Sequence, residues 1–169
     1  MTRLLAAVAA LAAILLAAPR SAPAFEYMAT CEGRPAAWAQ GEVLTYRLSS
    51  THVSDDLEDG QVRAALAAAW QEWSTPACST IEAQLGEPVE ADPFDEAVEE
   101  SVIGFYEDAW PASLGAGLLA LTRIRWAGDC TIFDGDIVFN GAENDWILGP
   151  PGDEGGKDLQ SVATHEIGH

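Results

Sequence analysis

The amino-acid sequence predicts an α/β (α+β) fold, in which a β-sheet packs against helices. Short apolar and β-branched runs of strand length recur along the chain. Two other segments carry apolar residues at spacings of three and four, the period of an amphipathic helix. The length of 169 residues and the 49% hydrophobic and 21% charged content suit one globular domain with its own core.

Residues 1–24 predict a secretory signal peptide. A short basic start at residues 1–3 precedes an apolar run over residues 4–18, and Ala22-Pro23-Ala24 is a small-x-small cleavage signal. The alternative, a membrane anchor, is weaker because a span needs about 20 apolar residues. We therefore expect cleavage after Ala24 and a secreted, extracellular chain of residues 25–169 without membrane contact.

The first half of this chain predicts a strand, a long helix and a second strand. Residues 42–48 mix β-branched and aromatic residues with polar ones, which is typical of a strand. The helix runs from about Leu57 to Trp73, Pro76 ends it, and residues 79–85 favour a second strand. One face of the helix carries the residues expected in the core, namely Val62, Leu66, Ala69, Trp70 and Trp73.

The second half predicts three more strands and a final helix. Residues 87–100 are acidic with two prolines and indicate a surface loop. The strands are expected over residues 102–106, 118–124 and 136–140. A loop rich in Gly, Pro and Asp follows at residues 144–157, and Asp158 is the expected N-cap of the helix.

The net charge bears on the partners that the protein can bind, and the cysteines bear on its disulfides. The formal net charge of −19 argues against nucleic acid and anionic lipid as partners. Export permits disulfides, and the cysteines are Cys31, Cys78 and Cys130. An odd number leaves either a free thiol or a cysteine whose partner lies in sequence not present here.

The last five residues, His165-Glu166-Ile167-Gly168-His169, form a metal-binding protease motif. On a helix, His165 and His169 project from one face, so both imidazoles can reach one Zn²⁺ at roughly 2.0–2.1 Å. Glu166 is the expected general base for a metal-activated water that attacks a peptide bond. Gly168 is expected to leave room beside the metal. The alternative, unrelated histidines on a helix face, is weak because this motif is rare by chance.

Residues 158–169 closely resemble the active-site helix of matrixins, the metzincin zinc metalloproteases that include the matrix metalloproteases. Residues 69–74 are similar to the end of the matrixin first helix, and residues 119–122 and 135–140 resemble strands of bacterial matrixin-like proteins. The resemblance covers most of residues 42–169. It implies a twisted, mixed five-stranded sheet with two long helices and a zinc endopeptidase activity. It also implies an antiparallel edge strand that pairs with a protein or peptide substrate in extended conformation. By position, residues 136–140 are expected to form that strand.

Two features depart from the family pattern. The metzincin motif continues past the second His to a third zinc ligand, whereas this sequence ends at His169. Because catalytic zinc sites use three protein ligands and a water, we expect a fragment of the catalytic domain that is inactive alone. The segment around Cys31 does not match the propeptide cysteine switch of the family, so a structural disulfide is its expected role.

Two further metal sites are weaker expectations. His52 lies in a polar loop, and a solvated histidine is favoured there over a structural-zinc ligand. Asp134-Gly135-Asp136 places only two carboxylates, whereas Ca²⁺ needs six or more oxygens.

Two alternative functions stay open. One is a zincin of another clan, with a downstream Glu as third ligand and a different fold. The other is a non-catalytic truncated metzincin that acts as an acidic extracellular binding domain.

Overall fold

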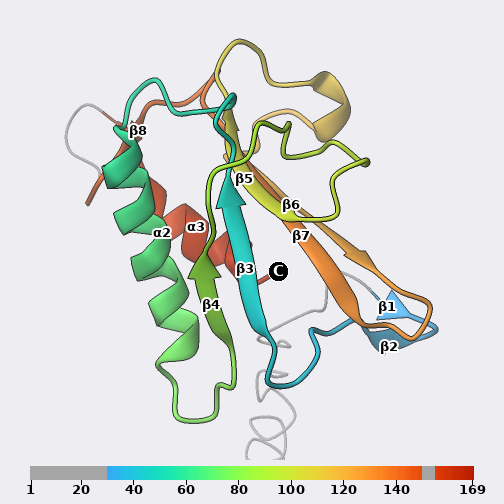
Figure 1. Cartoon of the computed structure of the whole chain (residues 1–169). Coiled ribbons are helices and arrows are strands. Elements are labelled where there is room, and N and C mark those ends of the chain that lie inside the picture. Colours follow the sequence, from blue (N-terminus) through green and yellow to red (C-terminus); the bar gives the residue numbers. More distant parts are fainter. Residues whose placement is uncertain (1–29, 150–154) are drawn as a thin grey trace, which may run out of the picture.

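The computed structural model of the chain describes residues 30–149 and 155–169 (Figure 1). Over these residues the chain forms a mixed five-stranded sheet with two α-helices, which confirms the predicted α/β class. The predicted signal peptide lies outside the described residues. No helix in the described part of the chain has the length and apolar character needed to cross a membrane.

The sheet is mostly parallel. Its strand order is β4-β3-β5-β7-β6, and every neighbouring pair is parallel except β6 with β7. The strands are β3 (Val43–Leu48), β4 (Glu82–Leu85), β5 (Ser101–Tyr106), β6 (Ala120–Trp126) and β7 (Ile132–Asn140). Two short strand pairs lie outside the sheet. Strand β1 (Thr30–Cys31) pairs with β2 (Arg34–Pro35), and β8 (Trp146–Ile147) pairs with β9 (Lys157–Asp158). All five predicted strands therefore form, with shifted ends.

The helices are α2 (Asp59–Ser74) and α3 (Leu159–Ile167). Helix α2 begins slightly after the predicted start, because Glu58 is its N-cap and the Glu58 backbone N–H donates to Gln61 Oε1 at 2.9 Å. It connects two parallel strands, β3 and β4, as a crossover helix does. A short 3-10 turn (Ala112–Leu114) precedes β6.

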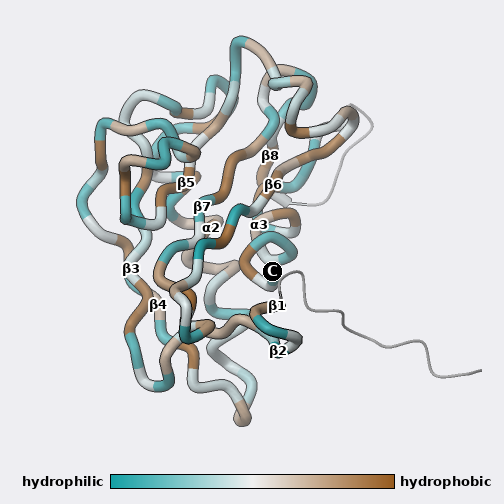
Figure 2. Tube along the Cα trace, turned by 90° about the vertical axis from the view of Figure 1, so that its right-hand side faces the viewer, coloured by the Kyte–Doolittle hydropathy of each residue, from teal (hydrophilic) through white to brown (hydrophobic). Residues whose placement is uncertain are grey.

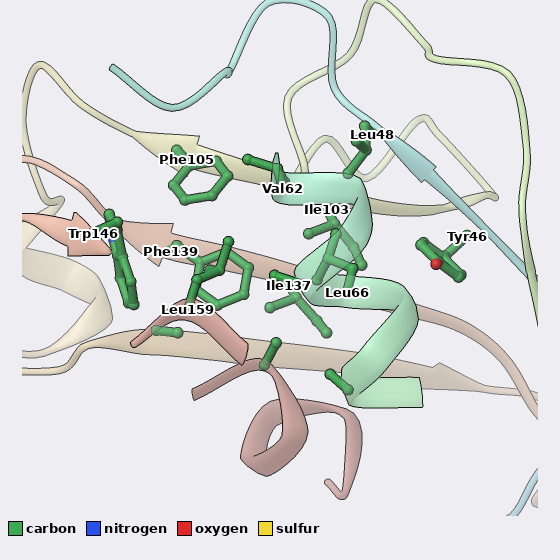
Figure 3. Close-up of a cluster of buried hydrophobic side chains, with 14 residues drawn as sticks. Tyr46, Leu48, Val62, Leu66, Ile103, Phe105, Ile137, Phe139, Trp146 and Leu159 are labelled. Carbon is green, nitrogen blue, oxygen red and sulfur yellow. The ribbon is translucent and has the colours of Figure 1, made fainter. Parts of the chain in front are cut away.

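Both helices pack on the same face of the sheet, and the core lies between them and the strands (Figures 1 and 3). Phe105 and Phe139 stack with ring centroids 5.1 Å apart, and Trp146 meets Phe139 edge-on at 5.2 Å. Helix α3 contributes Leu159 and Ala163, both fully buried and one turn apart. Burial of a leucine side chain stabilises the fold by about 1.5–3 kcal/mol, so this contact fixes the rotation of α3 about its axis.

The opposite face of the sheet is covered by the 87–100 segment. Arg123 and Arg125 of β6 donate to the carbonyl oxygens of Phe94, Glu96 and Val98. Gly104 makes room for this cover, because a Cβ there would lie 2.8 Å from Pro93 Cγ. The predicted surface loop therefore packs on the sheet, and its acidic side chains other than Asp92 are exposed.

The prediction that residues 136–140 form the edge strand is wrong. They belong to β7, which lies between β5 and β6, while β6 is the antiparallel edge strand. The physical reason is burial on both faces: residues 136–140 are all buried, as in an interior strand, whereas β6 alternates buried and partly exposed positions.

A disulfide joins Cys31 of β1 to Cys130, which lies just before β7, with the Cα atoms 5.4 Å apart. This bond agrees with the structural role expected for Cys31 and closes a long loop in the unfolded chain. Cys78 is an exposed free thiol. Among the described residues, the odd cysteine is therefore Cys78.

Candidate metal centre

Helix α3 begins where the sequence predicts, at the N-cap Asp158. Its carboxylate accepts from the Ser161 backbone N–H at 3.0 Å and from the Gly149 N–H at 2.8 Å. Burial acts to raise the pKa of Asp158, but the hydrogen bonds from Ser161 and Gly149 outweigh it and hold the pKa below the ordinary value. The cap therefore ties the start of α3 to the preceding loop in the ionised state.

The structure brings His165, Glu166 and His169 together at the C-terminal end of α3. The Nε2 atoms of the two histidines are 3.1 Å apart, and their rings meet edge to face with centroids 4.6 Å apart. One donor atom from each of the three residues lies within 4.8 Å of the others. Both histidines are exposed, while Glu166 is buried.

This donor set fits a zinc ion. Two nitrogens bound to tetrahedral Zn²⁺ at roughly 2.0–2.1 Å lie about 3.3 Å apart, so the Nε2 atoms need to move by only a few tenths of an ångström. Imidazole nitrogen is a preferred ligand of zinc and of several other transition metals. The three residues could therefore hold a metal ion, and zinc is the ion that the motif favours.

Glu166 has a specific partner on the sheet that the sequence did not reveal. Thr122 Oγ1 of β6 donates to Glu166 Oε2 at 2.6 Å and also lies 3.1 Å from the Glu166 carbonyl oxygen. Thr122 is 8% exposed and Glu166 is 6% exposed, so this contact lies at the interface of β6 and α3. Figure 2 shows α3 beside β6 with the C-terminus next to it.

Gly168 makes room for a helix contact, and the expectation that it leaves room beside the metal stays a prediction. A Cβ at Gly168 would lie 2.3 Å from Cζ2 of Trp73 on α2. The Trp73 indole N–H also donates to the Thr164 carbonyl oxygen at 2.7 Å. The tryptophan of α2 therefore fixes the position of the last turn of α3, which carries His165 and leads directly into His169.

A cavity of about 370 Å³ opens beside His165, between the start of β6 and α3. Residues 117–120 line one side, and Ser161, Val162, His165 and Glu166 line the other. Asn140 holds the sheet side in place, since its Nδ2 donates to the Leu118 carbonyl oxygen at 2.9 Å. The cavity is large enough for a side chain of a bound peptide.

His52 is less exposed than expected for a solvated loop residue. Its ring lies edge-on to Tyr106 at 5.6 Å, and its Nε2 lies 3.6 Å from the Asp92 carboxylate. Burial, together with the hydrogen bond donated to Asp92, raises the pKa of Tyr106 well above its ordinary value. His52 lies in this cluster, away from the His165–His169 pair, and joins no metal-binding group within the described residues.

Asp134 and Asp136 face arginines. Arg125 Nε lies 2.6 Å from Asp134, and Arg123 lies 2.9 Å from Asp136, which also accepts from the Val102 N–H at 3.0 Å. Burial raises the pKa of Asp136 to about 6. Because a guanidinium already occupies each carboxylate, the structure gives the Ca²⁺ expectation no support.

No protein family matches the chain, and no curated protein is significantly similar to it in sequence. The case for a function therefore rests on the geometry of the site and on the motif.

Proposed function

We propose that the protein is a secreted zinc-dependent endopeptidase of the matrixin type within the metzincins. The observation that carries the proposal is the His165–His169 pair, whose Nε2 atoms are 3.1 Å apart next to the carboxylate of Glu166. His165 and the buried Glu166 lie in the last turn of α3, and His169 lies just past its end. Together they supply the two imidazoles and the glutamate of the protease motif.

The architecture around the pair supports this proposal. The resemblance implies a mostly parallel five-stranded sheet with one antiparallel edge strand, and the observed sheet has that arrangement. The edge strand β6 lies against α3, so the motif helix and the strand border the same side of the molecule.

In this proposal His165 and His169 hold the zinc ion. Bound zinc would act as a Lewis acid toward the peptide carbonyl and make water more acidic. Glu166 takes the proton of the attacking water and returns it to the leaving amine as general acid. A complete catalytic zinc site takes three protein ligands and a water, and His165 and His169 would supply two of them.

The substrate is a protein or peptide in extended conformation. Strand β6 is the outermost strand, so the backbone groups on its outer edge can pair with an added strand. The adjoining cavity is lined mainly by apolar residues, and we expect it to take an apolar side chain of the substrate, of the size of leucine or phenylalanine.

Peptidase activity of the protein expressed from its complete gene tests the proposal. Loaded with zinc, the protein should cleave a quenched-fluorescent peptide library, and a chelator should abolish cleavage. Glu166→Ala should lower kcat by about a thousandfold or more without weakening zinc binding, since general base catalysis contributes 10²–10⁴-fold and the pair of histidines is intact.

The outcomes separate the alternatives. If the zinc-loaded protein cleaves nothing, the non-catalytic acidic binding domain is favoured and the proposal is wrong. A downstream Glu in place of a third His as zinc ligand would assign the enzyme to another zincin clan.

A further inference from the structure

The hydroxyl of Thr122 is the only side-chain donor that reaches the Glu166 carboxylate within the described residues. It lies 2.6 Å from Oε2 and 3.1 Å from the Glu166 carbonyl oxygen. A hydroxyl carries one proton, and an O–H donor bonds more strongly to a charged carboxylate at about 2.5–2.7 Å than to a carbonyl. The proton of Thr122 therefore belongs to Oε2.

This hydrogen bond makes the two carboxylate oxygens of Glu166 unequal. Oε2 is held by Thr122, while Oε1 receives no hydrogen bond from the described residues and is not among their enclosed polar atoms without a partner. Oε1 is therefore the oxygen that keeps contact with solvent. A carboxylate fixed through one oxygen presents the other in a constant direction, which a general base needs.

The alternation of β6 explains why Thr122 can do this. Successive side chains of a strand point to opposite faces, so Thr122 faces α3 while Arg123 and Arg125 face the 87–100 segment. A substrate strand that pairs with β6 would therefore add to the same strand that orients the base.

We propose that Thr122 is a positioning residue that holds Glu166 Oε2 and thereby presents Oε1 to the attacking water. The inference rests on the proposed endopeptidase function. Its consequence for the substrate is that β6, the strand proposed to pair with the substrate, also carries the residue that orients the base.

The hydrogen bond itself is tested first, in the metal-free protein. Urea unfolding is measured for the wild type, Thr122→Val, Glu166→Ala and the double variant. Thr122→Val should lower the midpoint clearly in the wild type and much less in the Glu166→Ala background, because the hydroxyl then has no carboxylate to satisfy. Equal shifts in both backgrounds would show that the two side chains are not coupled and would overturn the inference.

The positioning role is tested in the zinc-loaded protein from the complete gene. Thr122→Val should lower kcat about ten- to hundredfold, with KM and zinc affinity within about twofold of wild type, because the base is misoriented while both imidazoles are intact. Thr122→Ser restores the hydroxyl and should recover most of kcat. Thr164→Val is the matched control, since the Thr164 hydroxyl donates to the Gln160 carbonyl of its own helix and does not touch Glu166.

A wild-type kcat in Thr122→Val would overturn the inference and leave the proposed function intact. Equal losses in Thr122→Val and Thr122→Ser, with weaker zinc binding, would show a merely structural role. Absence of cleavage by the zinc-loaded wild type would refute the proposed function and with it any catalytic role of Thr122, whatever the unfolding data show.

Discussion

The polar side chains on the two faces of strand β6 differ in the partners that they have. On the face that meets the 87–100 segment, Arg123 and Arg125 each pair with a buried aspartate of β7. On the face that meets α3, Thr122 satisfies one oxygen of Glu166, and the two histidines beside it are exposed with their ring nitrogens facing each other.

The ion pairs on the first face form a structural cluster, whereas the residues on the second face form a candidate metal site. The arginines and aspartates neutralise each other and hold a loop on the sheet, so breaking a pair should destabilise the fold. Neither imidazole forms a salt bridge within the described residues, and their Nε2 atoms are 3.1 Å apart, a spacing that two ligands of one metal ion can also have. Substitutions on the first face should therefore change stability, and those on the second should change metal binding and activity.

The sharpest way to break the comparison is removal of one imidazole. His169→Ala should lower zinc affinity by more than about 100-fold and abolish cleavage, because a zinc site loses one of its nitrogen ligands. The metal-free protein should unfold at the same urea concentration as the wild type, since His169 is exposed. Calorimetric zinc titration and urea unfolding check both, and His52→Ala, which lies elsewhere, is the control for the loss of a histidine.

On the other face, Arg125→Met should destabilise the fold by about 3–5 kcal/mol, because the Asp134 side chain is completely buried and would be left without its partner. Zinc affinity of the folded protein should not change. The double variant Arg125→Met with Asp134→Leu should recover most of the stability. Arg63→Met, which breaks the exposed pair with Asp59, is the matched control and should cost less than about 1 kcal/mol. Unfolding free energies that are alike for Arg125→Met and Arg63→Met would contradict the structural role.

Gly168→Ala tests whether the contact between Trp73 and the end of α3 holds the histidines in position. Its Cβ would overlap the Trp73 ring, so we expect a loss of about 1–3 kcal/mol together with weaker zinc binding, because the turn that carries His169 must shift. Gly128→Ala, where a Cβ meets no atom within 4 Å, should leave both quantities unchanged. Wild-type zinc affinity in Gly168→Ala would show that the Trp73 contact does not place the histidines.

The sequence predicts the elements of this fold better than their neighbours in space. The spacing of Leu159 and Ala163 and the cap at Asp158 are local signals, and they predict α3 correctly. The helix ends at Ile167, so His165 lies on it while His169 lies just beyond its end. The order of β6 and β7 is not a local property, and the resemblance to a family led to the wrong edge strand. The continuous apolar run at residues 137–139 is typical of a strand buried on both faces, and it is the sequence signal for an interior position of β7.

Local sequence patterns also do not predict which distant residues form hydrogen bonds with the residues of the site. Thr122 and Glu166 are 44 residues apart in sequence, and Trp73 and Thr164 are 91 apart. Their contacts depend on how α3 lies on β6 and α2, which side-chain periodicity does not specify. The pairing of Asp134 and Asp136 with arginines likewise follows from the antiparallel register of β6 and β7, in which Arg123 lies opposite Asp136 and Arg125 opposite Asp134. An acidic turn read in isolation suggests a cation site, while the register supplies the cations from the protein itself.

The smallest expected effect is a pH dependence of the unfolding free energy. It arises on the arginine face, the face of β6 that carries Arg123 and Arg125. Burial, reinforced by the neighbouring Asp134, raises the pKa of Asp136 to about 6, whereas an unfolded aspartate titrates near 3.9. Between these values the folded protein binds the proton more tightly than the unfolded chain does. The contribution of Asp136 to stability is therefore fully present below about pH 4 and is lost as pH rises through about 6. One proton changes the unfolding free energy by at most ~1.4 kcal/mol per pH unit, and we expect about 1 kcal/mol between pH 5 and pH 6.

Asp136→Asn isolates this slope. The variant keeps an oxygen for the Val102 N–H but cannot take up the proton that Asp136 binds. It should therefore lack the stability that the wild type gains as pH falls, so the difference between the two proteins should be smallest at high pH and grow from pH 6 to pH 4. Urea unfolding of both proteins across this range gives the difference directly. A difference that shrinks toward pH 4 would mean that Arg123 holds Asp136 ionised, and the arginine face would then be a pair of ordinary buried salt bridges.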